Sequence, residues 1–170
     1  AIEELWLSPN NFLMLAKNIR NNLIDYTTTT VLTETIEEKY NEIEETLSFM
    51  DAELRSVATE AKSSGNPTLV VSSKKLAFLK NYGFDVVILD EDANQEVIKE
   101  EFDDGNYTDI YLCDTDEKTE FITSLEDDYE ANIITVDTMY TLTDEEANNN
   151  ENYLTIMRDF IDQIRNTTLG

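Results

Sequence analysis

Four short apolar runs in the second half of the chain constrain its fold more than any other feature. They are TLVVS (68–72), DVVILD (85–90), DIYLCD (109–114) and NIITVD (132–137), each rich in β-branched or aromatic residues. Amphipathic, helix-like segments lie near residues 74–82, 93–103 and 116–129, and another follows near 153–164. Strands that alternate with helices form βαβ units. We therefore predict a three-layer α/β domain with a mainly parallel four-stranded sheet flanked by helices.

A long helical segment precedes this pattern. Apolar residues recur there at steps of four and three, which places them on one face of a helix. This seam comprises Ile36, Tyr40, Ile43, Leu47, Met50, Leu54, Val57 and Ala61. An earlier helix is predicted to begin after Ser8 with Pro9 at its first position, and the threonines at 27–30 predict a bend. We expect a linker-helix region over 1–66, which a glycine and a proline end, and an α/β lobe over 67–170.

The charge of the chain limits its partners. Asp and Glu number 37 against 12 Lys and Arg, which gives a formal net charge of −25. This negative field repels nucleic acids and acidic membrane surfaces, so cations are the expected ligands. No apolar run reaches the roughly 18 residues that a membrane span needs. Histidine is absent, and the single cysteine, Cys113, lies in an apolar run and is expected to be buried.

Polar residues follow each of the four apolar runs. In parallel sheets of this class, ligands bind beyond the carboxyl ends of the strands. Those ends are expected to place Ser72, Ser73, Asp90, Asp114 and Asp137 at one edge. Hydroxyl and carboxylate oxygens are the ligands that hard cations such as manganese, magnesium and calcium prefer.

Six stretches, in order along the chain, resemble one known protein family. LWLSPNNFLMLAKNI is similar to the family's HxWLDP segment, YNEIEETLSFMDAELRSVA to its long linker helix, and TLVVSSKKLAFLKNYGFDVV to its strand, SHDAF turn and YGL segment. DIYLC resembles the IFFE strand, IITVD the LD strand end, and ENYLTIMRDFIDQI the closing YLxxMRxN helix. The family is that of the metal-specific (zinc or manganese) solute-binding lipoproteins of bacterial ABC importers, and the resemblance covers essentially the whole chain.

The resemblance implies two α/β lobes joined by the long helix, with a divalent metal ion (Mn, Zn or Ca) bound in the cleft between them. This chain would supply the helix and the C-terminal lobe, while the N-terminal lobe would lie outside it. The full-length protein would be lipid-anchored at the extracellular face of the bacterial cell membrane and would serve an ABC permease. The chain is not expected to be an enzyme.

The resemblance also assigns metal-ligand positions. Glu4 stands where the family has a ligand histidine, Ser73 where it has a histidine or glutamate, and Asp137 at its carboxylate ligand. Cys113 replaces a family glutamate. Because the chain has no imidazole, the implied site uses oxygen ligands or has been lost. Two alternatives remain open: Glu4 only places a charge near a helix start, and Asp137 only ends a strand at the surface.

Three other interpretations are open. The first is a surface or adhesion module that kept the fold without metal binding. In the second, Asp114 and Asp116 match the DxDxT pair of haloacid-dehalogenase-type phosphotransferases, as nucleophile and acid/base, with Lys118 at the threonine position. In the third, residues 90–101 follow a calcium-loop pattern with Gln95 at the glycine position.

Overall fold

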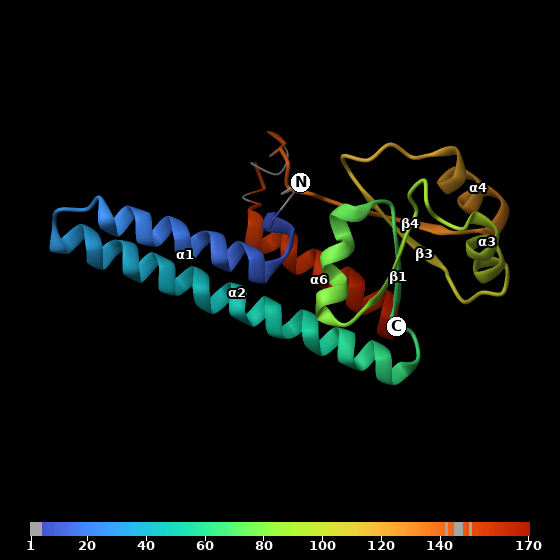
Figure 1. Cartoon of the computed structure of the whole chain (residues 1–170), viewed down its shortest axis with the longest axis horizontal. Helices are drawn as coiled ribbons and strands as arrows, with labels where there is room; N and C mark the ends of the chain where they lie inside the picture. Colours follow the sequence, from blue (N-terminus) through green and yellow to red (C-terminus); the bar gives the residue numbers. More distant parts are fainter. Residues whose placement is uncertain (1–4, 142, 145–147, 150) are drawn as a thin grey trace. The chain divides into compact units, whose positions relative to one another are not determined.

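A computed structural model describes residues 5–141, 143–144, 148–149 and 151–170 of the chain (Figure 1). It consists of two compact units, of which one ends at Ser56 and the other runs from Val57 to Gly170. Within the described ranges, no helix is both long and apolar enough to cross a membrane.

The first unit is built from helices. It contains η1 (Leu5–Leu7), α1 (Pro9–Asp25) and the larger part of α2 (Thr30–Ser64). Ser8 caps α1, because its hydroxyl accepts a hydrogen bond from the Asn11 amide at 3.5 Å. After α1, the Thr27 hydroxyl donates to the Leu23 carbonyl at 2.6 Å, which satisfies a helix-end acceptor. The chain leaves helical geometry between Asp25 and Thr30.

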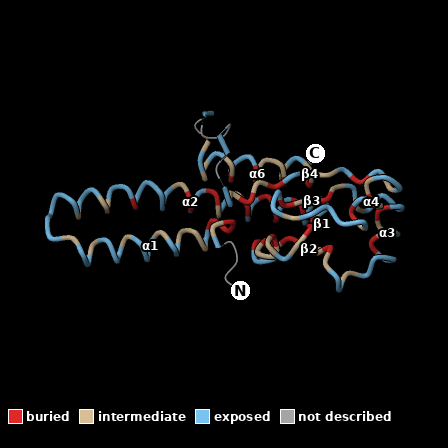
Figure 2. The backbone as a smooth tube through the Cα atoms, turned by 90° about the horizontal axis from the view of Figure 1, so that it is seen from above, coloured by how far each residue is buried: buried red, intermediate tan, exposed pale blue. Residues whose placement is uncertain are grey.

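Helices α1 and α2 lie side by side in this unit (Figures 1 and 2). The Arg20 guanidinium stacks over the Tyr40 ring at 4.7 Å and its Nε lies 3.6 Å from the Glu37 carboxylate. Between the helices runs a groove of about 310 Å³, which we call the α1–α2 groove. Its apolar lining includes Phe12, Ile19, Leu23, Ile36 and Ile43.

The seam of α2 is largely buried. Tyr40, Leu47, Met50, Leu54, Val57 and Ala61 are all at most 5% exposed. Ile36 is half-buried and Ile43 is 38% exposed, because both lie at the α1–α2 groove. The buried positions therefore concentrate in the second half of α2 (Figure 2).

The second unit contains one parallel sheet. Its strands are β1 (Thr68–Val71), β2 (Asp85–Ile88), β3 (Asp109–Cys113) and β4 (Asn132–Val136). Their order is β2-β1-β3-β4, and every neighbouring pair is parallel. The predicted four-stranded parallel sheet is confirmed. The strand order reverses between β1 and β3, the point at which sheets of this class leave room for ligands.

Helices cover both faces of the sheet (Figure 1). On one face, α3 (Gln95–Asp103) and α4 (Glu120–Tyr129) pack against the strands. The buried cluster there is Val70, Leu89, Ile98, Phe102, Ile110, Ile122, Leu125 and Ala131. On the other face, Tyr111 of β3 meets Phe160 of α6 (Tyr153–Leu169) edge to face, with ring centroids 6.5 Å apart. These layers confirm the predicted α/β architecture.

The connection after β1 is the 3-10 helix η2 (Lys74–Tyr82), in a segment predicted only as helix-like. Gly83 ends it with φ 112°, a left-handed conformation that glycine adopts without a steric penalty. Helix α4 begins at Glu120, later than the sequence suggested, because the Thr119 side chain caps it by accepting from the Ile122 amide at 3.2 Å. Residues 116–118, which were predicted as part of this helix, belong instead to the connection between β3 and α4.

The calcium-loop interpretation of residues 90–101 is wrong. The second half of that pattern is the helix α3, and the Asn94 side chain caps it by accepting from the Val97 amide at 3.4 Å. At the start of the pattern, Asp90 pairs with Lys74 at 2.9 Å. A helix cannot fold around an ion as an open loop does, so this segment is an ordinary strand-to-helix connection.

The phenol of Tyr111 makes the stability of the second unit sensitive to alkaline pH. Burial raises its pKa to about 12, against the weaker opposing effect of its hydrogen bond with Thr167. The neutral phenol therefore stabilises the folded state fully below pH 10, and this contribution is lost as the pH rises towards 12. We expect the free energy of unfolding in urea to fall by about 1 kcal/mol more between pH 8 and pH 10.5 in the wild type than in Tyr111→Phe.

Tyr26→Phe is the control for this measurement, because Tyr26 is 87% exposed. It should lose as much stability between the two pH values as the wild type. Equal losses in all three proteins would show that Tyr111 does not contribute.

Candidate functional site

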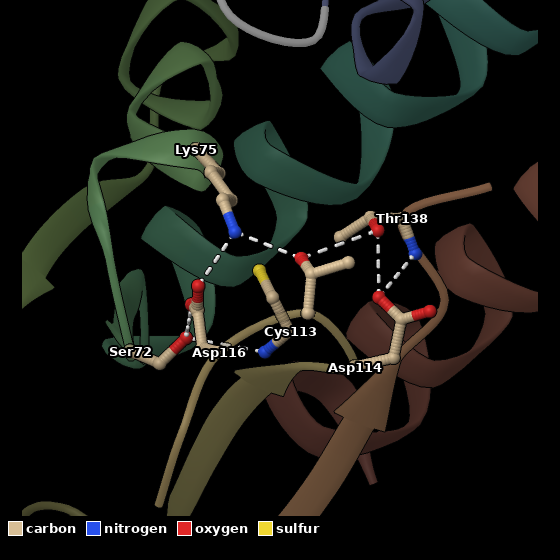
Figure 3. A network of polar contacts seen from close by, with 7 residues as sticks. Ser72, Lys75, Cys113, Asp114, Asp116 and Thr138 are labelled. Atoms are coloured by element: carbon tan, nitrogen blue, oxygen red, sulfur yellow. Dashed lines mark hydrogen bonds and ion pairs between the residues drawn. The ribbon is translucent and has the colours of Figure 1, made fainter. Parts of the chain in front are cut away.

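The carboxyl ends of β1, β3 and β4 are joined by side-chain hydrogen bonds (Figure 3). We call these residues the strand-end network. It comprises Ser72, Lys75, Cys113, Asp114, Thr115, Asp116 and Thr138. Ser72 directly follows β1, residues 114–116 follow β3, and Thr138 lies two residues after β4. The parallel strands bring together polar groups that are up to 66 residues apart in the sequence, from Ser72 to Thr138.

Asp116 is the centre of one half of the network. Its Oδ1 accepts from the Lys75 ammonium at 2.6 Å, and its Oδ2 accepts from the Ser72 hydroxyl at 2.6 Å. Ser72 Oγ in turn accepts from the Cys113 amide at 3.1 Å, which orients the hydroxyl towards Asp116. The Lys75 and Asp116 side chains are only 21% and 16% exposed. This ion pair is therefore shielded from water, unlike most ion pairs at protein surfaces.

The environment of Asp116 favours its charged form. Burial alone would raise the pKa of this carboxyl, but the hydrogen bonds from Lys75 and Ser72 and the Lys75 charge outweigh burial and lower it, with a further contribution from the nearby Ser73. The pKa of the neighbouring Cys113 thiol is shifted in the opposite direction. Burial, together with the Asp116 charge, raises the pKa of Cys113 to about 11, so this cysteine stays a neutral packing residue at pH 7.

The other half of the network links β3 to β4. The Asp114 Oδ1 accepts from the Thr138 amide at 3.0 Å and from its hydroxyl at 2.6 Å. The Thr138 hydroxyl also lies 3.4 Å from the Thr115 hydroxyl, which accepts from Lys75 at 2.8 Å. Asp114 and Asp116 thus bond to different partners on opposite sides of Thr115.

Ser73, a predicted metal ligand, lies beside this network. Its hydroxyl oxygen is buried and has no hydrogen-bond partner among the residues that the structure describes. It nevertheless stands near enough to Asp116 to contribute to lowering the pKa of that carboxyl. A buried oxygen with free lone pairs suits an additional donor or a cation.

Asp137, the second predicted ligand, lies apart from Ser73. Its Oδ1 accepts from the Met139 amide at 2.6 Å, across a turn in which Met139 has a φ of 55°. The residue lines a hollow of about 160 Å³ together with Glu151, Asp159 and Gln163. Because β3 lies between β1 and β4, the end of β3 separates Ser73 from Asp137.

The third predicted ligand, Glu4, lies outside the described residues. Within the described part of the chain, no group of three or more Asp, Glu, Cys or His residues is arranged to hold a metal ion. The oxygen atoms of Ser73 and Asp137 fit a hard cation in chemistry, and a complete coordination sphere would need further ligands.

The sequence pattern predicted Ser72 and Asp114 at the strand ends, and it named Asp116 only through the DxDxT pair. It did not predict Lys75 or Thr138. A basic residue in the first turn after β1 was the available signal, since the first helical turn in such folds lies over the carboxyl edge of the sheet. The sequence did not show which of the adjacent Lys74 and Lys75 turns inward. Lys74 is 71% exposed and pairs with Asp90, whereas Lys75 points into the network.

The parallel sheet and the strand-end network together define an α/β lobe that presents oxygen atoms at the carboxyl ends of its strands. A protein family described as the zinc-uptake complex component A, periplasmic (ZnuA) matches residues 3–167, and the chain belongs to this family. No curated protein is significantly similar in sequence. Because the family is one of transport components, membership confirms the expectation that the chain is not an enzyme.

Solved structures share the fold. The metal-dependent lipoprotein YcdH from Bacillus subtilis is 20% identical with a TM-score of 0.77, over 96% of this chain and 62% of that protein. The Zn(II)-bound ZnuA-like domain of AdcA from Streptococcus pneumoniae is 21% identical with a TM-score of 0.74, over 97% and 63%. The periplasmic zinc-binding protein TroA from Treponema pallidum is 14% identical with a TM-score of 0.69, over 97% and 63%. The chain thus spans less than two thirds of the length of these relatives.

Proposed function

We propose that the chain is part of the solute-binding component of a metal-ion ABC importer. On this proposal it binds a divalent cation, as cargo, between its α/β lobe and a further N-terminal lobe. The complete protein would be lipid-anchored at the extracellular face of the bacterial cell membrane and would deliver the cation to an ABC permease. Membership of the zinc-uptake family supports this function, and the net charge of −25 would concentrate cations around the lobe.

The observation that carries the proposal is the buried Ser73 oxygen without a partner among the described residues. A buried polar atom left without a hydrogen bond costs free energy, and a bound cation would offset that cost. We propose Ser73, Asp137 and Glu4 as the ligands from this chain, with the N-terminal lobe completing the site. Manganese and calcium accept such an oxygen set readily, and zinc accepts carboxylates as well.

The α1–α2 groove supports the presence of a second lobe. Ile19 and Leu23 at the groove are 51% and 50% exposed, and Ile43 is 38% exposed. Contiguous apolar surface of this kind usually marks a contact with another protein surface. We propose that the N-terminal lobe covers this groove in the complete protein.

Asp137→Asn tests the cargo site. In calorimetric titrations of the complete two-lobed protein with Mn²⁺, Zn²⁺ or Ca²⁺, we expect the substitution to raise the Kd of the bound ion at least about tenfold. Even residues that only support a metal ligand typically change affinity by about 10–100-fold. Ionic strength is held constant, because added salt also screens the negative charge of the protein.

Asp103→Asn is the matched control, since Asp103 is an exposed residue of α3 and the substitution changes the charge equally. It should leave the Kd within about twofold of the wild type. If Asp137→Asn behaved like Asp103→Asn, Asp137 would not be a ligand. A wild-type protein that responds to none of the three cations would contradict the transport proposal and favour the surface or adhesion module.

A further inference from the structure

The Lys75 ammonium lies among oxygen atoms that would otherwise suit a free cation (Figure 3). It is 2.6 Å from Asp116 Oδ1 and 2.8 Å from Thr115 Oγ1. The adjacent Lys74 differs sharply, since its side chain is 71% exposed and it pairs with Asp90 at the surface. Of these two neighbouring lysines, Lys75 is the one directed into the edge of the sheet.

The oxygen atoms around Lys75 are positioned by other bonds. Ser72 holds the second oxygen of Asp116, and the Cys113 amide holds Ser72. Thr115 lies within 3.4 Å of Thr138, which Asp114 orients. These contacts would remain if the ammonium were removed, so the carboxylate and hydroxyl oxygens are preorganised around the Lys75 position.

We propose that Lys75 is a built-in cation that closes this part of the edge to metal ions. Its ammonium occupies the position at which Asp116 and Thr115 would bind a free cation, and its positive charge repels any ion that approaches the same oxygens. A metal ion can bind at Asp116 only where Lys75 is displaced or neutralised.

A titration of the full chain with Mn²⁺ tests this proposal. Free Mn²⁺ is followed by electron paramagnetic resonance at constant ionic strength. We expect Lys75→Gln to bind one more Mn²⁺ than the wild type does. The Kd of this additional ion should be at least tenfold lower than the Kd of any additional Mn²⁺ in the wild type. Lys74→Gln is the matched control, because it removes the same charge from the adjacent residue and should show no additional site. Lys75→Arg keeps the positive charge and should also show none.

Double variants separate this inference from the proposed cargo site. The Mn²⁺ gained in Lys75→Gln should vanish when Asp116→Asn is added and should persist when Asp137→Asn is added. Failure of the cargo proposal would instead appear as an unchanged Kd in Asp137→Asn on the wild-type background. The built-in-cation proposal is overturned if Lys75→Gln and Lys74→Gln bind Mn²⁺ alike, or if the gain survives Asp116→Asn.

Two further measurements apply if Lys75→Gln does not fold. Lys75→Met keeps most of the side-chain volume without its charge, and the same additional Mn²⁺ is expected. On the wild-type background, Asp116→Asn should change Mn²⁺ affinity less than twofold, because Lys75 already occupies that carboxylate. A tenfold loss in that variant would show that Asp116 binds the ion with Lys75 in place, which contradicts the proposal.

Discussion

Phe102→Ala is expected to lower the free energy of unfolding of the chain by about 3–5 kcal/mol, which is the usual cost of deleting a buried aromatic ring. Phe102 of α3 is 4% exposed and belongs to the cluster between the sheet and the helices α3 and α4. It also meets Tyr107 edge to face, with ring centroids 5.7 Å apart. The substitution therefore removes apolar contact area, leaves a cavity and breaks an aromatic pair.

The measurement is chemical unfolding in urea followed by circular dichroism, with Phe49→Ala as the control. Phe49 also lies in a helix but is 62% exposed, so the same substitution should change stability by less than about 1 kcal/mol. Similar losses for the two variants would contradict the burial that the structure assigns to Phe102.

Asp116→Ala is expected to lower the free energy of unfolding by about 2–3 kcal/mol, somewhat less than the loss for a fully buried ion pair because the pair retains some exposure. The substitution leaves the Lys75 ammonium, which is only 21% exposed, without its carboxylate, and it removes the acceptor of the Ser72 hydroxyl. Both polar groups then stay poorly hydrated without a strong partner.

Asp90→Ala is the comparison, because Asp90 pairs with the neighbouring Lys74 at the surface. A surface pair of this kind contributes little, so its loss should cost at most about 1 kcal/mol. The difference between the two variants measures how far the fold shields the Lys75–Asp116 pair. Equal losses would mean that the pair is as open to water as the Lys74–Asp90 pair.

The inward position of Lys75 affects how an oxygen-based cation site could work in this lobe. The Lys75 ammonium, carried by a flexible side chain, neutralises the Asp116 carboxylate while no metal is bound. The lobe therefore has no unpaired carboxylate at this position. A divalent ion that uses these oxygens competes with a group that is covalently tethered beside them. Affinity at this edge therefore depends on Lys75 as well as on the ligands.

The strands could be located from the sequence because their signal is local. The four apolar runs correspond to β1 to β4, with bounds that differ by one or two residues at the carboxyl ends. The last amphipathic segment corresponds to α6, whose Met157, Phe160, Ile161 and Ile164 are buried. Periodicity reports which side of an element faces the core, and that information lies within a few neighbouring residues.

The candidate site could be predicted only in part from local sequence patterns. The presence of serines and aspartates at the strand ends followed from the pattern of the runs, but their partners did not. Residues 90–101 illustrate the limit, because a motif that resembled an ion-binding loop is half helix. Lys75 and Asp116 are 41 residues apart, and no local rule connects them.

By itself, the sequence determined the class of the fold, the position of each strand, the acidic character of the surface and the family resemblance. These depend on composition and on short-range periodicity, which a single chain displays without its partners in space. Only the tertiary structure decided that Lys75 turns inward while Lys74 turns outward, and that the end of β3 separates Ser73 from Asp137. Strand order and side-chain direction depend on packing between distant segments, and that packing determines which charges meet at the edge of the sheet.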